Sequence, residues 1–564
     1  MDRNTLLAFL LISVVLIFTP KYMDLVSPPS NVEEIEGFNE PTELTGPVND
    51  KAIPSTLLPG EKEKTTEKIH SVVHNETITK IENNLYEATV SSVNGGSLTS
   101  FIIKNYFKAD SLPVDLLSGL KSENLLFFIE DLDGNPINVN QSWKLETEYI
   151  PPFLDEEHTL EFSLIVFGEK ITKKLTFSPD SYVIQVHVDC SKIRNNIFRD
   201  LELGWFGGLA PTEEDVLGDQ TYFQSYVYQG GELENQKVKS GKTEEQTFNG
   251  PADWVAIRTK YFVSALIPSE PSAIEKTLLS SSFQENETYN ASFVVESGKK
   301  SEFLLYLGPL EYDEIKTLSV DLDMVMDFGW SFIRPISKGV LYCLKEIHKL
   351  VPNYGFVLII FSFLVKLIVY PLTKKSYQST AAMQTIQPEI NKLREKHKNN
   401  PQKLNQATMQ LYKEKGVNPL GGCLPMLLQM PLLLALFQVF RTTIELRAEP
   451  FIWWIKDLSA PDTIIHLPLT IPIYGDQISV LPILMVISMF IQQRMMTPGA
   501  QQPQQKTMQY FMTGFFFLMF NSFPSGLNLY YTLFNISCFF YLHCHKFKIV
   551  KMTRNKYSFF IIFF

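Results

Sequence analysis

The chain has 564 residues, of which 45% are hydrophobic, and its formal net charge is −11 at pH 7. Residues 1–325 carry 26 Lys and Arg against 51 Asp and Glu, a net of −25, whereas residues 326–564 carry 24 against 10, a net of +14. This split predicts two parts in different compartments. It argues against direct nucleic-acid readout, because the basic residues lie between predicted membrane spans, where membrane topology accounts for them.

The first predicted element is a transmembrane anchor at residues 1–25. Thr5–Thr19 is apolar and follows Arg3, and no small-x-small cleavage motif comes after it. We therefore expect an uncleaved helix with its N-terminus in the cytoplasm. Residues 26–67 are rich in Pro, Glu, Thr and Asn and almost lack aromatic residues, which predicts a disordered linker.

In residues 68–325, apolar and polar residues alternate with a period of two. Segments such as Leu85–Val90, Ser97–Phe107 and Ile171–Phe177 alternate apolar and polar residues, with Gly, Asn or Pro turns between them. Many short alternating strands predict an all-β sandwich with its own core. The segment contains no Gly-rich phosphate loop, nucleophile elbow or paired metal ligands. We therefore expect no catalytic residue, no cofactor and no metal.

The sequence pattern of residues 326–352 predicts an amphipathic helix. The apolar residues Phe332, Ile336, Val340 and Leu344 recur at helical spacing, and basic residues stand between them. Such a helix is suited to lying in the membrane interface. An ordinary core helix is the alternative, which the membrane span directly after it disfavours.

Five further spans are predicted in residues 353–545: Asn353–Leu372, Leu420–Phe440, Val480–Gln492, Met508–Phe523 and Leu527–Leu542. Between the first two, residues 374–417 carry nine Lys and Arg against three Glu. The positive-inside rule places this segment, a predicted helical hairpin, in the cytoplasm. Residues 546–564 form a cytoplasmic tail. With the anchor, six spans put both termini inside and the acidic β domain outside.

One cation, Lys366, lies inside the first of these five spans. A lysine in a membrane helix is costly and usually faces a partner or a water-filled cavity. Ser362 and Tyr370 lie four residues before and after it, so one helix face reads Ser-Lys-Tyr. Snorkelling of the lysine to the nearer surface is the alternative. No acidic residue occurs within the later spans to pair with it, which favours a hydrated groove.

Two other spans offer polar groups as well. Gln429 lies in Leu420–Phe440, and Asn528, Tyr531 and Asn535 fall at i, i+3 and i+7 of the last span. Lipid cannot satisfy these groups, so we predict that they face one another around the groove. Direct helix–helix hydrogen bonding is the alternative for the asparagines and Gln429.

Six different short motifs lie along the membrane half: Tyr370-Pro371-Leu372-Thr373-Lys374, Gln387-Pro388-Glu389-Ile390, Val417-Asn418-Pro419-Leu420-Gly421-Gly422-Cys423, Gln429-Met430-Pro431, Asp457-Leu458-Ser459 and Phe523-Pro524-Ser525-Gly526-Leu527. On these motifs the chain resembles the YidC/Oxa/Alb family of membrane protein insertases, in the Gram-negative form with a large periplasmic domain. The resemblance implies a polytopic α-helical membrane protein with a periplasmic β-supersandwich, in which the five later spans form a cationic hydrophilic groove.

The resemblance also implies a function and its residues. Lys366 falls on the groove cation, Met430, Pro431 and Tyr531 on substrate-contacting positions, and Ser362 near the cation. The implied function is a non-enzymatic insertase and chaperone of the bacterial inner membrane, acting alone or with the Sec translocon. The implied partners are nascent membrane proteins, the Sec translocon, the ribosome and membrane lipids.

The residue at position 366 departs from the family pattern. Most bacterial members of the family carry arginine at the groove position, whereas this chain carries lysine. Arginine stays charged wherever it lies, but lysine loses its proton more readily when it is desolvated. Lys366 therefore predicts either a groove wet enough to keep it ionised or a weaker dependence on charge.

Two other functions are considered. A solute transporter or channel with an extracytoplasmic sensing domain would predict inverted repeats and discontinuous helices, and the sequence shows no repeat. A membrane-tethered sugar-binding or sugar-modifying protein would need acid–base carboxylates in the β domain. Five closely spaced polar-faced helices are more than an anchor requires.

Overall fold

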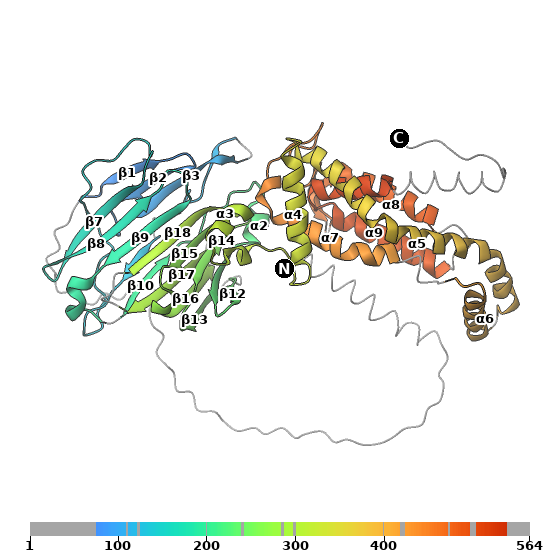
Figure 1. The fold of residues 1–564 in the computed structure, drawn as a ribbon, viewed down its shortest axis with the longest axis horizontal. Coiled ribbons are helices and arrows are strands. Elements are labelled where there is room, and N and C mark those ends of the chain that lie inside the picture. The colour runs from blue at the N-terminus through green and yellow to red at the C-terminus, as the bar shows by residue number, and fades with distance from the viewer. Residues whose placement is uncertain are drawn as a thin grey trace, which may run out of the picture. The chain divides into compact units, whose positions relative to one another are not determined.

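The computed structural model describes residues 75–537, apart from 109–110, 121–123, 199, 239–241, 284–286, 297–300, 399, 418–423, 472–473 and 497–502. The predicted N-terminal anchor, linker and C-terminal tail therefore lie outside the described residues. A β-rich part comes first along the chain and a mostly helical part follows it (Figure 1).

The β-rich part is built from antiparallel strands. They are β1 Ile78–Glu82, β2 Tyr86–Ser91, β3 Ser97–Phe107, β4 Pro113–Asp115, β5 Leu126–Phe128, β6 Lys144–Leu145, β7 His158–Val166, β8 Glu169–Phe177, β9 Val183–Asp189, β10 Asp200–Trp205, β11 Gln224–Gln229, β12 Glu232–Gln236, β13 Thr243–Asn249, β14 Trp254–Arg258, β15 Phe262–Pro268, β16 Ile274–Phe283, β17 Glu287–Glu296 and β18 Ser301–Pro309. Short helices lie among and after them: η1 Ser191–Asn196, α2 Val216–Gln220, η2 Pro271–Ala273, α3 Tyr312–Thr317 and η3 Leu322–Val325.

These strands form three sheets. A nine-stranded sheet has the order β12-β11-β14-β15-β18-β9-β8-β7-β6, a five-stranded sheet the order β13-β16-β17-β10-β5, and a four-stranded sheet the order β1-β2-β3-β4. The five-stranded sheet packs against β11, β14 and β15. The four-stranded sheet packs near β7 and β8, where Gly96 lies so close that an added Cβ would be 2.7 Å from the Phe162 ring. Only glycine fits this approach at its φ of +102°.

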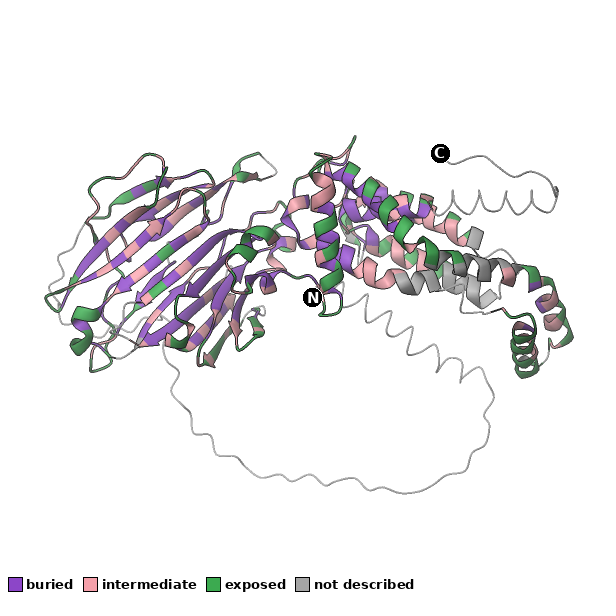
Figure 2. Ribbon diagram, in the orientation of Figure 1, coloured by how far each residue is buried: buried purple, intermediate pink, exposed green. Residues whose placement is uncertain are grey.

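The strands expected from the period-two pattern are confirmed to within two residues at each end. Ser97–Phe107 is β3, and Ile171–Phe177 lies within β8. In β8 the inward residues Ile171, Leu175 and Phe177 are fully buried, while the outward residues Thr172, Lys174 and Thr176 are only partly buried. Figure 2 shows this alternation along the strands. The hydrophobic core of a sandwich therefore follows from the pattern.

Lys173 interrupts the apolar face of β8. Its side chain is fully buried, and its ammonium donates hydrogen bonds to the carbonyl oxygens of Asn94 (3.0 Å) and Leu125 (2.7 Å). No carboxylate pairs with it within the described ranges. Burial lowers the pKa of Lys173 from its ordinary 10.5 to about 7.

This lysine predicts a pH-dependent stability of the β-rich part. Between the folded pKa of about 7 and the unfolded value of 10.5, the unfolded chain binds more protons, so the free energy of unfolding rises with pH, by at most about 1.4 kcal/mol per pH unit. Urea unfolding of the detergent-solubilised chain measures this rise, with proteolysis of the β-rich part as the readout of unfolding. Lys173→Met should abolish it. Lys174→Met, which removes a partly exposed neighbour, should preserve it, and an unchanged rise in Lys173→Met would contradict the assignment.

The helical part contains α4 Arg334–His348, α5 Tyr354–Lys396, α6 Pro401–Glu414, α7 Leu424–Thr442, η5 Ile444–Leu446, α8 Val480–Met496, α9 Pro503–Phe520 and a helix at 525–537. Within the described ranges, Tyr354–Pro371 is the one helical stretch both long and apolar enough to span a membrane, with a mean hydropathy of 2.0. Val480–Arg494 and Tyr510–Phe520 are shorter apolar helices. The count of six spans therefore stays a prediction.

Two helices differ in extent from the sequence pattern. The amphipathic helix begins only at Arg334, because Gly329 has a φ of 86° and Pro335 favours the first turn of a helix. The first of the five spans does not end where the polar sequence resumes; α5 continues for 43 residues to Lys396. Its second half packs against α6 through Ile386, Ile390 and Leu411.

A two-stranded antiparallel sheet lies between α7 and α8. It consists of β19 Thr463–Ile471 and β20 Gly475–Ser479. The sequence pattern predicts no strand here. Because apolar residues occupy consecutive positions of β19, the alternation that signals a strand is missing.

Arg447 connects the helical part to the β-rich part. Its side chain is almost fully buried, and its guanidinium forms an ion pair of 2.7 Å with Glu213. It also donates to the carbonyl oxygens of Phe107 (2.8 Å) and Thr212 (3.4 Å). The rings of Tyr261 and Phe262 lie 5.8 and 5.7 Å from the guanidinium carbon. One side chain thus contacts several segments of the β-rich part.

Candidate functional site

Lys366 lies in the second half of the apolar stretch Tyr354–Pro371 of α5. Its ammonium nitrogen is 4.5 Å from the centre of the Phe534 ring, on the helix at 525–537. A cation over an aromatic face is stabilised by about 0.5–2 kcal/mol, depending on its exposure to water. More than one turn before Lys366, Phe361 of α5 contacts Tyr530 of the helix at 525–537, with ring centres 5.9 Å apart. Lys366 therefore lies where these two helices meet.

The neighbours of Lys366 along α5 differ in exposure. Ser362 is buried, and its hydroxyl donates to the carbonyl of Ile359 in its own helix (2.8 Å). Tyr370, at the other end of the predicted face, is exposed. Leu367 and Ile368 are 75% and 66% exposed, so α5 presents apolar side chains outward beside its cation. Ser362 is thus buried among the helices, whereas Lys366 lies at the edge of the packed helices.

The two asparagines of the last described helix make packing contacts. The Asn528 amide donates to the carbonyl oxygens of Phe520 (3.1 Å) and Phe523 (3.3 Å), which lie at and after the end of α9. The Asn535 amide donates to the hydroxyl of Ser488 on α8 (3.2 Å). These bonds match the alternative of direct helix–helix hydrogen bonding. They tie the helix at 525–537 to α8 and α9.

Tyr531 differs from the asparagines. Its ring contacts those of Phe520 and Tyr530, with centres 6.0 and 5.2 Å apart. Its hydroxyl and that of Tyr530 are buried without a hydrogen-bond partner in the described part of the chain. A buried hydroxyl without a partner costs about 1–3 kcal/mol.

The remaining candidate residues lie on α7. Gln429, Met430 and Pro431 are each partly buried, and α7 packs against both α4 and α5. The helix continues through Pro431. The structure thus places these residues on a helix that adjoins α5, and it places Lys366 against the helix that carries Tyr531.

Phe534 is the site residue that sequence reasoning missed. An aromatic residue in a membrane span gives no polar signal, so nothing in its type marks it. Its position does carry information, since it lies three residues after Tyr531 and therefore on the same helix face. Looking for an aromatic residue on the predicted polar face would have found it.

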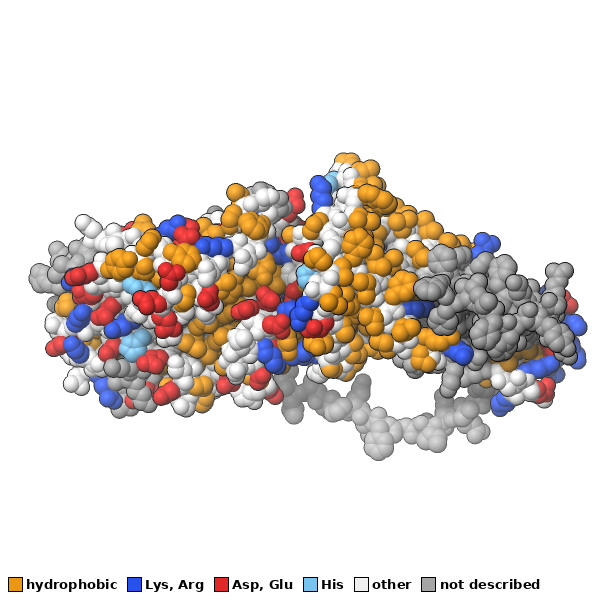
Figure 3. Space-filling model, turned by 45° about the horizontal axis from the view of Figure 1, so that its top comes forward, with side chains coloured by type: hydrophobic (Ala, Val, Ile, Leu, Met, Phe, Trp, Pro, Cys, Tyr) orange, Lys and Arg blue, Asp and Glu red, His pale blue; other side chains and the backbone are white. Residues whose placement is uncertain are grey.

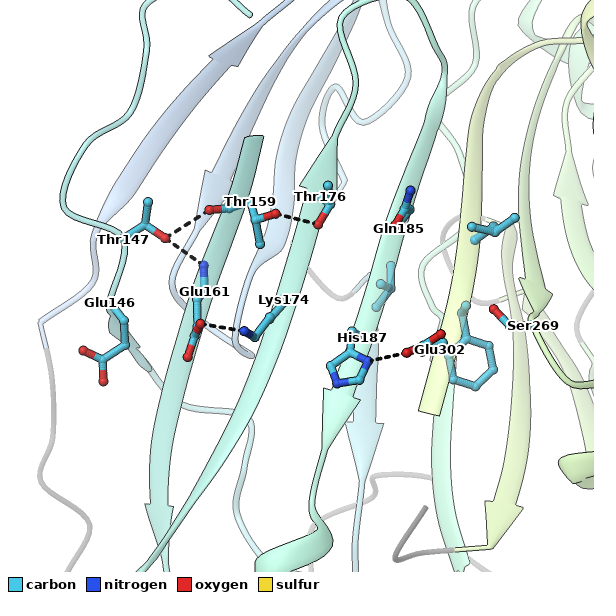
Figure 4. Close-up of a pocket in the computed structure, with 13 residues that line it drawn as sticks. Glu146, Thr147, Thr159, Glu161, Lys174, Thr176, Gln185, His187, Ser269 and Glu302 are labelled. Carbon is cyan, nitrogen blue, oxygen red and sulfur yellow. Dashed lines mark hydrogen bonds and ion pairs between the residues drawn. The ribbon is translucent and has the colours of Figure 1, made fainter. Parts of the chain in front are cut away.

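A separate cleft of about 530 Å³ lies on the nine-stranded sheet (Figure 4). It is lined by Glu146, Thr147, Thr159, Glu161, Lys174, Thr176, Gln185, Val186, His187, Ser269, Glu302, Phe303 and Leu304. Two of its acidic residues face a nitrogen-bearing side chain: Glu161 lies 2.8 Å from Lys174, and Glu302 lies 3.3 Å from His187. The cleft is therefore polar.

Glu146 of this cleft does not suit the role of a general acid in sugar-modifying chemistry. A general acid at neutral pH needs a carboxyl group whose pKa is raised. Hydrogen bonds from Lys144, Ser163 and Lys170 instead lower the pKa of Glu146 to about 2. Glu146 therefore stays ionised and cannot donate a proton to a leaving group.

Comparison with known proteins gives matches along nearly the whole chain. The family model of the 60Kd inner membrane protein matches residues 346–549, and that of the YidC periplasmic domain matches residues 78–338. The membrane protein insertase YidC of Chlorobium luteolum is 35% identical over 95% of this chain and 94% of its own length. That of Chlorobaculum tepidum is 34% identical over 95% and 93%. A crystal structure of active YidC insertase with the first transmembrane domain resolved covers 85% of this chain and 94% of its own, with 18% identity and a TM-score of 0.35.

Proposed function

Because this chain belongs to the YidC family of membrane protein insertases, we propose that polar segments of its substrates cross the membrane beside Lys366, between α5 and the helix at 525–537. The observation that carries the proposal is the position of the cation. Lys366 lies against Phe534 at the edge of the packed helices, next to outward apolar side chains of α5. A polar segment and an apolar segment of one substrate would find matching surfaces there.

The energetics support such a path. A charged residue at the centre of a membrane helix costs about 2.5–3.5 kcal/mol on insertion scales, and each large apolar residue returns a few tenths. A cationic, partly hydrated surface lowers the first cost, while burial of the substrate's apolar helix supplies the driving force. Lys366 would attract acidic residues of the translocated segment. The hydroxyls of Tyr530 and Tyr531 would form hydrogen bonds with the backbone of that segment.

The proposal includes a topology and partners. The β-rich part lies in the periplasm, and the N-terminus and the α5–α6 hairpin lie in the cytoplasm, with six spans in the inner membrane. The hairpin is mostly exposed (Figure 2), and its basic residues suit contact with the ribosome or a nascent chain. Cooperation with the Sec translocon is proposed on the family resemblance.

Photo-crosslinking from position 531 tests the proposed path. A benzoylphenylalanine at Tyr531 should crosslink to the apolar segment of a ribosome-stalled membrane-protein chain, because this side chain shares a helix face with the residue that contacts Lys366. The signal should fade when the chain is released. The same probe at Tyr342, which is 66% exposed on α4, serves as the matched control and should give little product. Equal signals at both positions, or none at Tyr531, would remove the proposed path.

A further inference from the structure

The ribbon formed by β19 and β20 exposes apolar side chains. Ile464 and Ile465 are 50% and 53% exposed, and Leu469 is 70% exposed. The pairing of β19 with β20 is irregular next to Ile465, but the exposed residues are spread along the strand, so β19 is not covered along its length. A two-stranded ribbon with one polar face would suffice in water, and an isolated ribbon is only marginally stable there. An apolar ribbon of this kind indicates a contact outside the chain.

The base of the ribbon is fixed to helix ends. One carboxylate oxygen of Asp462 accepts hydrogen bonds from the backbone N–H groups of Val480 (3.0 Å) and Leu481 (2.8 Å), at the start of α8. The Asn521 amide, just after α9, donates to the carbonyl oxygens of Tyr474 (2.9 Å) and Gln477 (2.6 Å). The ribbon is thus held against the ends of α8 and α9.

The ribbon lies at the level where these helices end. The ring of Tyr474 is 5.6 Å from that of Phe517, in the last turn of α9. Phe517 precedes the end of α9 at Phe520 by three residues, or roughly 5 Å along the helix axis. If α9 spans the membrane, its end marks the boundary of the hydrocarbon, and β19 lies along that boundary.

A strained tryptophan adjoins the same base. Trp453 is 85% exposed and has a φ of 56°, a conformation that bulky residues rarely adopt. It stacks on Trp454, whose indole N–H donates to the Asp462 carboxylate that caps α8 (2.9 Å). Tryptophan favours the membrane–water interface. A rigid support therefore holds an exposed indole next to the apolar ribbon.

We propose that the β19–β20 ribbon and Trp453 bind the boundary between headgroups and acyl chains in the periplasmic leaflet. The inference goes beyond the insertion path and rests on the proposed function only for the membrane placement of α8 and α9. Hydrophobic side chains also dominate the face of the helical part seen in Figure 3, so the ribbon continues a surface of the same kind. Residues 463–479 contain no Lys or Arg and one acid, Asp476, so the binding should not depend on anionic lipids or on salt.

Fluorescence quenching in vesicles tests the proposal. The full-length chain, with its five cysteines replaced by serine, carries an NBD label on a cysteine at position 469 and is reconstituted in phosphatidylcholine vesicles. We expect a blue-shifted emission that is quenched more by a nitroxide near the top of the acyl chain than by one near its end. Labels at Ile487 on α8, which is 51% exposed, and at Leu132 in the β-rich part, which is 65% exposed, are the controls. The first should be quenched by nitroxide lipids and the second should not.

The controls separate the possible outcomes. A quenched label at Ile487 with an unquenched label at Leu469 would overturn the ribbon proposal alone. Unquenched labels at both positions would overturn the membrane placement of α8, and the proposed function with it. In the chain with its native cysteines, a benzoylphenylalanine at Leu469 gives an independent measurement by mass spectrometry. Lipid adducts support the proposal, whereas adducts to a protein in place of lipid would overturn it.

Discussion

Replacing Lys366 by alanine is expected to lower the insertion of substrates with acidic translocated segments by about tenfold or more. Two opposite charges about 4 Å apart at a partly solvated site attract each other by up to about 4 kcal/mol, and a loss of 1.4 kcal/mol is tenfold in an equilibrium. Lys366→Arg should keep most of the activity, because arginine preserves the charge and also binds the face of the Phe534 ring. Insertion into inverted membrane vesicles, measured by protease protection, reports the difference.

Two comparisons make the Lys366 experiment specific to charge at this position. Lys374→Ala removes an exposed cation eight residues further along α5 and should leave insertion nearly unchanged. Substrates whose translocated segment lacks acidic residues should be affected less by Lys366→Ala than acidic ones. Full activity of the alanine variant on the acidic substrates would exclude an electrostatic role for Lys366.

Replacing Arg447 by methionine is expected to weaken the attachment of the β-rich part by about 3–5 kcal/mol, the usual cost of removing one partner from a buried ion pair. The variant leaves the Glu213 carboxylate, whose side chain is 16% exposed, without its cation, and two carbonyl groups lose their donor. Hydrogen exchange of the full chain should show faster exchange around Thr212 and Phe107. When Glu213→Gln is added to Arg447→Met, the further loss of stability should be smaller than the loss that Glu213→Gln causes alone, because the two residues act as a pair.

An exposed ion pair of the same type is the control for Arg447. Arg194 lies 3.9 Å from Glu296, and their side chains are 60% and 40% exposed. Exposed pairs contribute about 0–1 kcal/mol, so Arg194→Met should leave exchange and thermal stability almost unchanged. Equal losses for both variants would show that burial does not decide the strength of the Arg447 pair.

The regular elements could be predicted because their side-chain periods are local. The strands around Ser97 and Ile171 and the helices on either side of residue 399 follow from spacing alone. Lys173 and the β19–β20 ribbon could not. An inward lysine looks like any polar residue of a strand until the carbonyl groups that bind it are placed by the fold. An apolar ribbon without alternation has no period to detect.

The candidate site was predictable in part. Lys366 is identified by its type, since a cation in an apolar stretch has no ordinary packing role. The roles of Asn528 and Asn535 could not be read from spacing, because the carbonyl and hydroxyl groups they bind belong to other elements and are brought close only by folding. Phe534 was missed for a related reason: its importance depends on which residue lies across from it.

The continuity of α5 has a mechanical consequence. Its 43 residues correspond to a rod of roughly 65 Å at 1.5 Å per residue, which carries Lys366 near one end and half of the hairpin at the other. The prolines at positions 371 and 388 each remove one backbone hydrogen bond and are the natural points of bending. A partner that tilts the hairpin would therefore bend α5 first at these prolines, of which Pro371 lies five residues after Lys366.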